Sequence, residues 1–203
     1  LAHDRYQQFQ AGIKRHPFKM RSRIGIDRAS GKITAFAADH VLDGGGLDNF
    51  SANVATVAAT AAIGIYDVPK VDVTTVAQHS RGVTAGSMRG YGTLQTMTAL
   101  EVLIDEAATA LPLDPIEFRR RNALKPHGRT MTGNPYSVSV RTTEILGKLE
   151  KHPIWRDRTQ EKARTQTNGV LVGTGVACVT KDYGAGADCS LGRVEIDRDG
   201  RIA

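Results

Sequence analysis

The residues best suited to chemistry form a glycine-rich stretch near the middle of the chain. Three glycines fall within seven residues, in the run G-S-M-R-G-Y-G from Gly86 to Gly92. Because glycine has no Cβ and tolerates positive φ, the backbone can bend there and another molecule can approach it closely. A glycine turn that enters a helix also leaves backbone N–H groups unpaired, which suits an anionic or strongly polar ligand. The alternative is a tight loop that only packs, because a short glycine motif is a weak signal.

Two elements must hold this stretch in place. The β-branched, alternating run from Val71 to His79 predicts a strand that leads into it. His79 itself is expected to be a hydrogen-bonded structural residue. The apolar run from Leu94 to Leu111 predicts a buried core helix, with Thr93 as its N-cap. Glu101 lies inside that helix, where a buried carboxylate requires a partner, and we expect its role to be structural.

The first third of the chain predicts a β-hairpin followed by a helix. The segments from Lys19 to Ile26 and from Lys32 to His40 alternate, with a glycine-containing turn between them. The run D-G-G-G from Asp43 to Gly46 is expected to be a flexible, solvent-facing corner. Ser51 is placed to cap an Ala-rich helix from about Asn53 to Ile63.

The segment after the core helix predicts another helix with a clear start. Asp114 is the expected N-cap, Pro115 the first helical residue, and Glu117 the third residue of a capping box. In that helix we expect Phe118 to face inward and the three arginines at 119–121 to face mainly outward.

The last third predicts two further helices and two strands. The helices are expected from Thr143 to Leu149 and from Ile154 to Arg164, and the strands from Val170 to Thr180 and from Ser190 to Asp197. The fold class is therefore α+β, with mixed or antiparallel sheet strands and flanking helices. The whole of residues 1–203 is expected to be part of one domain.

Composition narrows the classes of function. The net charge of +6 and the pI of about 9.5 would permit nucleic-acid binding. However, the basic residues are dispersed and accompany no nucleic-acid motif. Two cysteines are too few for a disulfide framework or a zinc site. No apolar run reaches membrane-spanning length, and Leu1 begins no signal-peptide pattern. A folded domain whose basic face is solvated, or docks on a neighbour, is the favoured interpretation.

Four segments in the same order resemble the molybdenum hydroxylases, the molybdopterin-binding large subunits of the xanthine dehydrogenase and aldehyde oxidase family. The family pattern is an Arg-Gly-aromatic-Gly loop, a Gln shortly after it, a Glu in the following helix, and a D-P-x-E-x-R-x-x-N run. The matching residues here are Arg89, Gly90, Tyr91, Gly92, Gln95, Glu101, Asp114, Pro115, Glu117, Arg119 and Asn122. The run R-H-P-F, which begins at Arg15, also fits. The resemblance covers most of the chain but only a fraction of the family's large subunit.

The resemblance implies a molybdenum-dependent hydroxylation that uses oxygen from water, with a glutamate as general base. That glutamate and a glycine-rich cofactor loop lie outside this stretch, so the chain alone is expected to be inactive and to supply no catalytic residue. The implied cofactor is molybdopterin, as the cytosine dinucleotide, which holds the metal without protein ligands. Met88, Arg89 and Gly90 are implied to bind it. Tyr91 and Gly92 are implied to contact substrate, although core packing is the alternative for the Tyr91 ring.

The resemblance also implies partners. These are the rest of the large subunit, an iron–sulfur subunit, and a subunit that carries FAD or haem. No nucleic acid and no membrane insertion are implied, and the implied compartment is the cytoplasm, with the periplasm as the alternative. Purine-oxidising members place an arginine in the substrate pocket, whereas the matching place near Val57 holds no basic side chain. This favours an aldehyde or an N-heteroaromatic substrate over xanthine. The alternative function is a non-catalytic structural or assembly domain that shares the fold.

Overall fold

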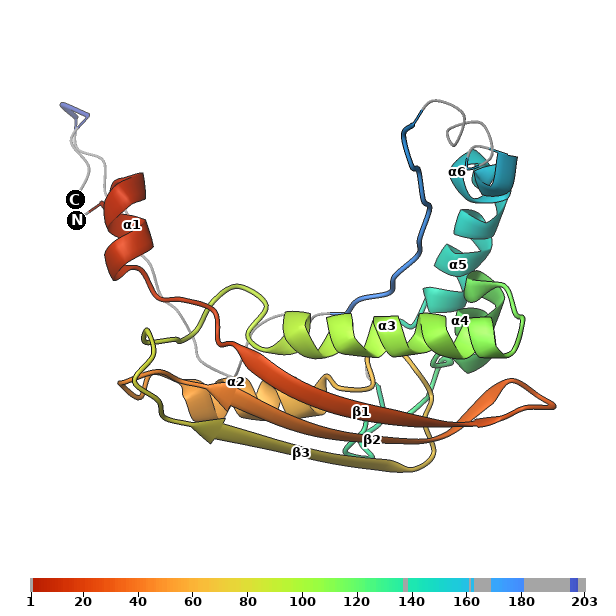
Figure 1. Ribbon diagram of the computed structural model, residues 1–203, viewed down its shortest axis with the longest axis horizontal. Helices are drawn as coiled ribbons and strands as arrows, with labels where there is room; N and C mark the ends of the chain where they lie inside the picture. The colour runs from red at the N-terminus through yellow and green to blue at the C-terminus, as the bar shows by residue number, and fades with distance from the viewer. Residues whose placement is uncertain (1, 137–138, 161, 163–168, 181–197, 201–203) are drawn as a thin grey trace.

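The computed structural model describes residues 2–136, 139–160, 162, 169–180 and 198–200, and its centre is a three-stranded sheet (Figure 1). Strands β1 (Phe18–Asp27) and β2 (Lys32–Asp43) form an antiparallel hairpin whose turn contains Gly31 at φ 68°. Strand β3 (Val71–Gln78) pairs with β2 in parallel, which gives the order β1-β2-β3. The predicted hairpin, the third strand and the mixed sheet are thus confirmed.

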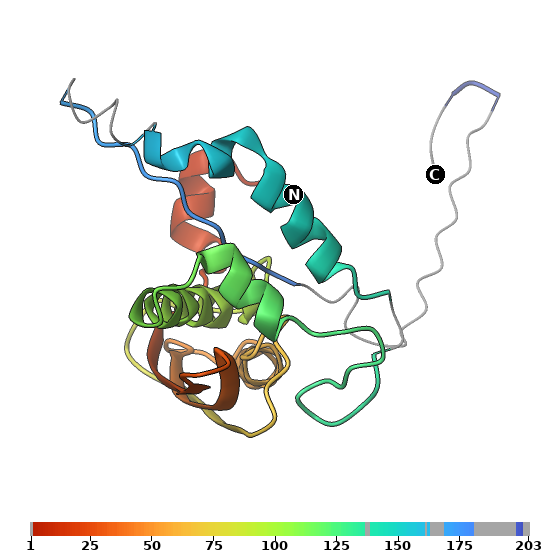
Figure 2. The same ribbon diagram turned by 90° about the vertical axis from the view of Figure 1, so that its right-hand side faces the viewer.

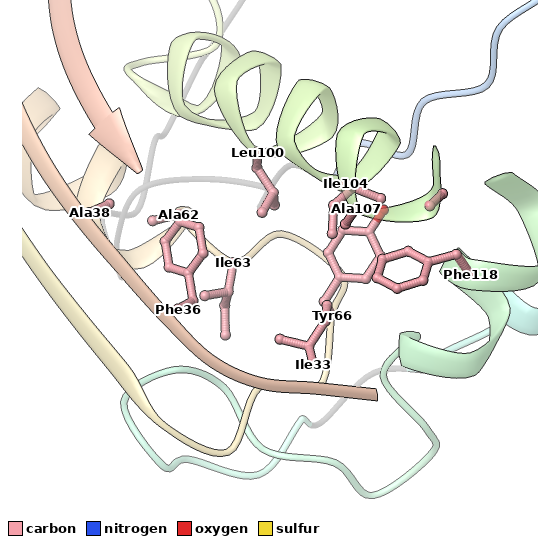
Figure 3. Close-up of a cluster of buried hydrophobic side chains, with 11 residues drawn as sticks. Ile33, Phe36, Ala38, Ala62, Ile63, Tyr66, Leu100, Ile104, Ala107 and Phe118 are labelled. Atoms are coloured by element: carbon pink, nitrogen blue, oxygen red, sulfur yellow. The ribbon is translucent and has the colours of Figure 1, made fainter. Parts of the chain in front are cut away.

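Two helices cover one face of this sheet. Because β2 and β3 are parallel, the chain must cross over between them, and α2 (Ser51–Thr60) makes that crossover. Helix α2 packs on β3, whereas α3 (Thr93–Ala110) packs on β1 (Figures 1 and 2). The buried side chains of β2, of the segment after α2, of α3 and of the helix that follows it meet in one core cluster (Figure 3): Ile33, Phe36, Ala38, Ala62, Ile63, Tyr66, Leu100, Ile104, Ala107, Ala108 and Phe118.

The corner after β2 is buried, which corrects the expectation of a flexible, solvent-facing corner. Gly44 and Gly45 are both buried. The Gly44 N–H donates to the Gln78 carbonyl at 2.9 Å, and the Gly44 carbonyl accepts from the Ala85 N–H at 3.0 Å. A Cβ on Gly45 would lie 2.3 Å from the Val83 carbonyl oxygen. The corner is fixed because the segment that follows β3 packs directly against it.

Neither Ser51 nor Thr93 caps a helix, which corrects two further predictions. Helix α2 begins at Ser51, directly after Phe50 at φ 57°, and α3 begins at Thr93, directly after Gly92. Neither start has a side-chain cap hydrogen bond. In both cases a residue with positive φ, and not a capping side chain, turns the chain into the helix.

A smaller unit extends beyond the sheet at the far end of α3 (Figure 1). Helix α4 (Pro115–Asn122) leads from the core to α5 (Thr142–Lys151) and the short α6 (Pro153–Arg156). There Ile116, Leu146 and Trp155 form a separate buried cluster. At the other end of the molecule, α1 (Arg5–Ala11) buries no residue. The helices predicted after Pro115 are thus confirmed. The last of them was predicted to run to Arg164, but α6 ends at Arg156. Beyond it, residues 158–160 and 162 are helical among the residues that the structure describes.

The predicted strand from Val170 to Thr180 is not formed. Residues 170–180 make neither helix nor strand, although Thr174, Val176 and Cys178 are less exposed than the residues between them. The alternation that predicted a strand is therefore present, but no strand among the described residues pairs with it. The other predicted strand, Ser190–Asp197, lies outside the described residues.

Candidate functional site

The glycine-rich stretch forms a loop that bends through three consecutive residues with positive φ. These are Gly90 at 97°, Tyr91 at 54° and Gly92 at 88°. Glycine adopts such angles freely, whereas a tyrosine rarely does. Two short hydrogen bonds close the bend: the Tyr91 N–H donates to Met88 at 2.8 Å, and the Thr93 N–H donates to Gly90 at 2.9 Å. The two glycines therefore determine how the loop enters α3.

Both ends of this loop are anchored to the segment from Lys14 to His16. Lys14 forms a parallel bridge with Ala85, and its carbonyl accepts from the Gly86 N–H at 3.0 Å. On the other side, Gln95 Nε2 donates to the His16 carbonyl at 3.1 Å. The R-H-P-F run that fits the family pattern thus forms the floor of the loop.

The middle of the loop offers free backbone donors. Within the part of the chain that the structure describes, the N–H groups of Met88, Arg89, Gly90 and Gly92 donate to no acceptor. They precede the first turn of α3, where the helix dipole favours negative charge. The loop can therefore donate several hydrogen bonds to the acceptors of one polar ligand.

Two buried side-chain atoms beneath the loop also lack partners among the described residues. They are Arg15 Nη1, a charged donor, and Gln95 Oε1, an acceptor. The point where a Cβ on Gly90 would sit is 3.4 Å from Arg15 Nη1. Free amides above a guanidinium suit an oxygen-rich, negatively charged ligand and do not suit an apolar one. The residues present thus fit a molybdopterin, whose phosphate and ring oxygens accept such donors.

The five residues that the sequence proposed for this site lie together but differ in exposure. Arg89 is exposed, Met88, Gly90 and Tyr91 are half-buried, and Gly92 is buried. A Cβ on Gly92 would lie 2.7 Å from the Val54 carbonyl oxygen of α2. Gly92 therefore lets α2 and the start of α3 approach, while the loop from Met88 to Tyr91 reaches the surface.

Three titratable side chains, His16, Asp43 and His79, form hydrogen bonds in the segments that pack against the loop. The ring of His16 is buried, with Nε2 2.9 Å from Ser51 Oγ, and burial lowers the pKa of His16 although Asp43 opposes the shift. Hydrogen bonds from the Gly45 N–H and the Ser80 hydroxyl hold the pKa of Asp43 below its usual range. His79 Nδ1–H donates a hydrogen bond to the Gly45 carbonyl at 3.3 Å, which is consistent with the structural role expected for His79.

Glu101 of α3 is structural, as the sequence predicted. It is buried and binds Arg119, whose Nε and Nη2 donate to Oε2 at 2.9 and 2.8 Å. The Tyr66 hydroxyl donates to Oε1 at 2.5 Å, and the Cys178 N–H donates to Oε2 at 2.8 Å. Burial, followed by the nearby Glu101 charge, raises the pKa of the Cys178 thiol to about 11. This carboxylate therefore joins α3 to α4 and to the segment around Cys178, away from the glycine-rich loop.

The burial of Arg119 corrects the prediction that the three arginines of α4 face mainly outward. Its side chain is 0% exposed, and its Nη1 lies 2.8 Å from Asp105. Arg120 and Arg121 do face outward and pair with Glu117. Because the Glu117 carboxylate binds these two arginines, it does not complete the predicted capping box among the described hydrogen bonds. Asp114 caps the helix by accepting from the N–H groups of Ile116 and Glu117.

Arg15 is the site residue whose position the sequence did not reveal. It belongs to a run that matches the family pattern, but no local signal indicates that its guanidinium lies under Gly90. Contacts of that kind depend on tertiary packing between segments that are distant in sequence.

Among the described residues, no group of His, Cys, Asp or Glu is arranged to hold a metal ion. No described helix is long and apolar enough to cross a membrane.

A family model for the molybdopterin cofactor-binding domain matches residues 1–123 of the chain. The chain belongs to this family. The matched residues include the glycine-rich loop, the segment beneath it and α3. The cofactor of the family is therefore the kind of polar, anionic ligand that the free donors of the loop suit. The chain is also 28% identical over 201 residues to a probable xanthine dehydrogenase subunit of Bacillus subtilis. It is 29% identical over 207 residues to the aldehyde oxidoreductase of Megalodesulfovibrio gigas.

The chain spans about a quarter of the length of these relatives. The match covers 98% of this chain but 26% of the Bacillus protein, and 100% of this chain but 22% of the Megalodesulfovibrio protein. Among solved structures, the aldehyde oxidoreductase from Desulfovibrio gigas matches with a TM-score of 0.70 and 27% identity, over 78% of this chain and 17% of that one. Quinoline 2-oxidoreductase from Pseudomonas putida 86 matches with a TM-score of 0.71 over 82% of this chain and 22% of that one, at 24% identity, which supports the fold. The α+β class, with flanking helices, is confirmed.

Proposed function

We propose that this chain is the central part of a molybdopterin-binding subunit in a molybdenum-dependent hydroxylase or dehydrogenase. The observation that carries the proposal is the surface loop from Met88 to Tyr91, with its unpaired amides and the Arg15 guanidinium beneath it. Such a loop is suited to a polar anionic ligand, and the family of the chain is defined by a molybdopterin. We assign residues 1–203 to one partial domain of that subunit.

Each residue of the loop has a distinct proposed role. Met88, Arg89 and Gly90 bind the cofactor, the first and third through backbone N–H groups and Arg89 through its amide and its charge. The Tyr91 ring lies beside the substrate, where ring-on-ring contact would orient a flat molecule. Gly92 contacts the substrate through its backbone, because α2 fills the space beside its Cα. When bound, the cofactor supplies the metal centre at which water-derived oxygen is transferred and electrons are accepted.

The proposed substrate is an aldehyde or an N-heteroaromatic ring. Purine-oxidising enzymes of the family carry an arginine at the place that matches Val57, whereas α2, which contains Val57, carries no basic side chain. Similar proteins include one named nicotinate dehydrogenase and one named nicotine 6-hydroxylase, each 27% identical to this chain. Others are named for xanthine or for aldehydes. The absence of a basic side chain from α2 is what favours an aldehyde or an N-heteroaromatic ring over xanthine.

The remaining parts of the proposal follow from the family. The cofactor form is the cytosine dinucleotide, and the partners are the rest of the large subunit, an iron–sulfur subunit, and a flavin or haem subunit. The proposed compartment is the cytoplasm, with the periplasm as the alternative. The 203-residue chain by itself is proposed to be inactive, because the general base and the other cofactor loops of the family are not among its residues.

The test compares the 203-residue chain with the intact subunit that contains it. Molybdenum is measured by mass spectrometry and pterin by the fluorescence of its oxidised form, and both are expected in the intact subunit. Oxidation of benzaldehyde, nicotinate and xanthine is then assayed, with activity expected for one of the first two and none for the chain alone. If the 203-residue chain binds molybdenum and oxidises any of these three substrates, the proposal that it is inactive by itself is wrong. An intact subunit without pterin would favour a non-catalytic assembly domain.

A further inference from the structure

The sheet has an outer face that α2 and α3 do not cover. These helices pack on the inner face, where Ile24, Phe36 and Val73 belong to the core cluster or pack against it (Figure 1). Because successive side chains of a strand point to opposite faces, the residues next to these three lie on the outer face. Sheets of parallel strands are usually covered on both faces, and β2 and β3 form a parallel pair. The uncovered outer face therefore indicates a neighbour outside the described residues.

Three basic residues form a row on the outer face. Lys19, Arg21 and Arg23 are alternate residues of β1, and all three are exposed. Among the described residues, none of the three makes an ion pair or a side-chain hydrogen bond. In contrast, Arg120 and Arg121 both bind a carboxylate of their own helix. This basic row therefore carries three positive charges without a bound counter-charge.

Beside the basic row, the outer face is hollowed. In the register of the sheet, Arg23 lies opposite Ala37 of β2, and Ala37 lies beside Asp72 of β3. These residues, with Gly25 and Ala35, are among those that line a hollow of about 310 Å³. The glycine and the two alanines carry nothing larger than a methyl group. The hollow therefore suits an apolar side chain of a neighbour.

An acidic protein segment suits the outer face better than a nucleic acid or a membrane does. Two exposed carboxylates, Asp39 and Asp72, also lie on this face, and Asp39 is directly opposite Arg21. A nucleic-acid strand or an anionic lipid surface presents continuous negative charge, which these carboxylates would repel. In a protein segment, acidic side chains can face the basic row while neutral ones face the two aspartates, and an apolar one can enter the hollow.

We propose that the outer face binds an acidic segment of the same large subunit, from outside residues 1–203. Its carboxylates pair with Lys19, Arg21 and Arg23, and one of its apolar side chains fills the hollow. The chain covers 26% of one relative and 22% of another, so most of such a subunit is available to supply this segment. The inference rests on the proposed function, because it takes the chain to be part of a longer subunit.

The first test is zero-length cross-linking of the intact subunit. A carbodiimide joins a lysine amine directly to a carboxylate, so only groups in contact react, and mass spectrometry identifies both residues. Lys19, and the lysine introduced by Arg23→Lys, are expected to be joined to Asp or Glu outside residues 1–203. Raising the salt to 1 M, where the Debye length is about 3 Å, should reduce both products. Lys125, an exposed lysine outside the sheet, is the control and should give no product with the same segment.

The second test reverses charge in the same subunit. Arg21→Glu combined with Arg23→Glu should lower the melting temperature by about 2–4 °C, because repulsion replaces two attractive pairs. Lys125→Glu combined with Lys151→Glu makes the same change of net charge at two exposed residues outside the sheet and should have a smaller effect. Changing the cross-linked carboxylate to lysine should restore the melting temperature of the first variant.

The inference is overturned if Lys19 is joined only to residues 1–203, to another subunit, or to no carboxylate. It is also overturned if the variant of Arg21 and Arg23 melts like the control variant, or if the compensating lysine does not restore it. Pterin is measured on the same preparations. An intact subunit without pterin would refute the proposed function, whereas a subunit that holds pterin but lacks the cross-link would refute this inference alone.

Discussion

Among single residues, Arg119 shows how much a buried charge depends on its partners. Its guanidinium is shielded from water and binds both Glu101 and Asp105. Arg119→Met would leave the buried Glu101 carboxylate without its counter-charge. Breaking such a pair by removing one member costs about 3–5 kcal/mol. We therefore expect the free energy of unfolding, measured by urea titration with far-UV circular dichroism, to fall by that amount.

The next residue supplies the matched control. Arg120 belongs to the same helix, but its side chain is 44% exposed and pairs with Glu117 and Glu150 at the surface. Exposed ion pairs contribute about 0–1 kcal/mol, so Arg120→Met should change the unfolding free energy by no more than that. Equal effects of the two substitutions would contradict the distinction between a buried and a surface arginine.

His16 makes the floor of the loop sensitive to pH. Burial lowers its folded-state pKa below the ordinary value of 6.5, so the unfolded chain binds the proton more readily. This contribution to stability is complete above pH 6.5 and is lost as the pH falls toward the folded-state pKa. Melting temperature should therefore decline below pH 6.5 more steeply in wild type than in His16→Gln. His40, whose pKa burial also lowers, remains in both proteins and so cancels in the comparison. Asp43 faces His16, and its charge opposes part of the shift in the pKa of His16. Parallel pH profiles would show that His16 does not contribute.

Sequence reasoning succeeds for residues whose role is set locally and fails for those set by distant partners. Asp114 caps α4 because its side chain reaches N–H groups two and three residues ahead, which spacing alone predicts. The sequence places Arg119 at the surface because its partner Glu101 is on another helix. Ser51 has the sequence position of a cap, but its hydroxyl is taken by His16, which lies on the floor of the glycine-rich loop. A single sequence does not reveal such pairings.

Among the elements, the junction of α2 with α3 depends on the absence of a side chain at Gly92. An alanine there would combine two penalties. Its φ of 88° disfavours a Cβ by about 1–2 kcal/mol. A Cβ would also lie 2.7 Å from the Val54 carbonyl oxygen, and overpacking typically costs about 1–3 kcal/mol more. Gly92→Ala should therefore lower the unfolding free energy by about 2–5 kcal/mol, measured by urea titration.

Gly133 separates the two penalties. It has a similar φ of 83°, but a Cβ there would meet nothing within 4 Å. Gly133→Ala should therefore show only the conformational cost, about 1–2 kcal/mol. If Gly92→Ala were no more destabilising than Gly133→Ala, the close approach of α2 would not matter for stability.

Secondary structure was predictable where an element also has its partner nearby in the chain. The hairpin of β1 and β2 needs only a turn, and α3 has enough apolar residues to be a core helix on its own. The run from Val170 to Thr180 carries the same alternation as a strand but finds no ladder partner among the described residues. Its inward side chains Val176 and Cys178 pack on the cluster of α4, α5 and α6 instead. Alternation predicts which side chains are buried, whereas pairing depends on the rest of the structure.

At the scale of the whole molecule, the described part of the chain has two unequal cores. Strand β2, the segment after α2, helix α3 and Phe118 of α4 share a cluster of eleven buried residues, whereas the second cluster, of α4, α5 and α6, contains the three buried residues Ile116, Leu146 and Trp155. A region with few buried apolar contacts opens at lower free energy than the main core. We therefore expect the smaller unit to unfold first in urea.

The single tryptophan of the chain makes this expectation measurable. Trp155 lies in the smaller cluster, so its fluorescence reports that unit, whereas far-UV circular dichroism reports the whole fold. The fluorescence midpoint should fall at lower urea concentration than the dichroism midpoint, which is a departure from two-state unfolding. In a Trp155→Phe, Phe36→Trp variant the probe moves to the main core, and its midpoint should coincide with or exceed that of the dichroism signal. Coincident transitions in the wild-type chain would instead mean that α4, with Arg119 bound to Glu101 of α3, couples the two cores into one cooperative unit.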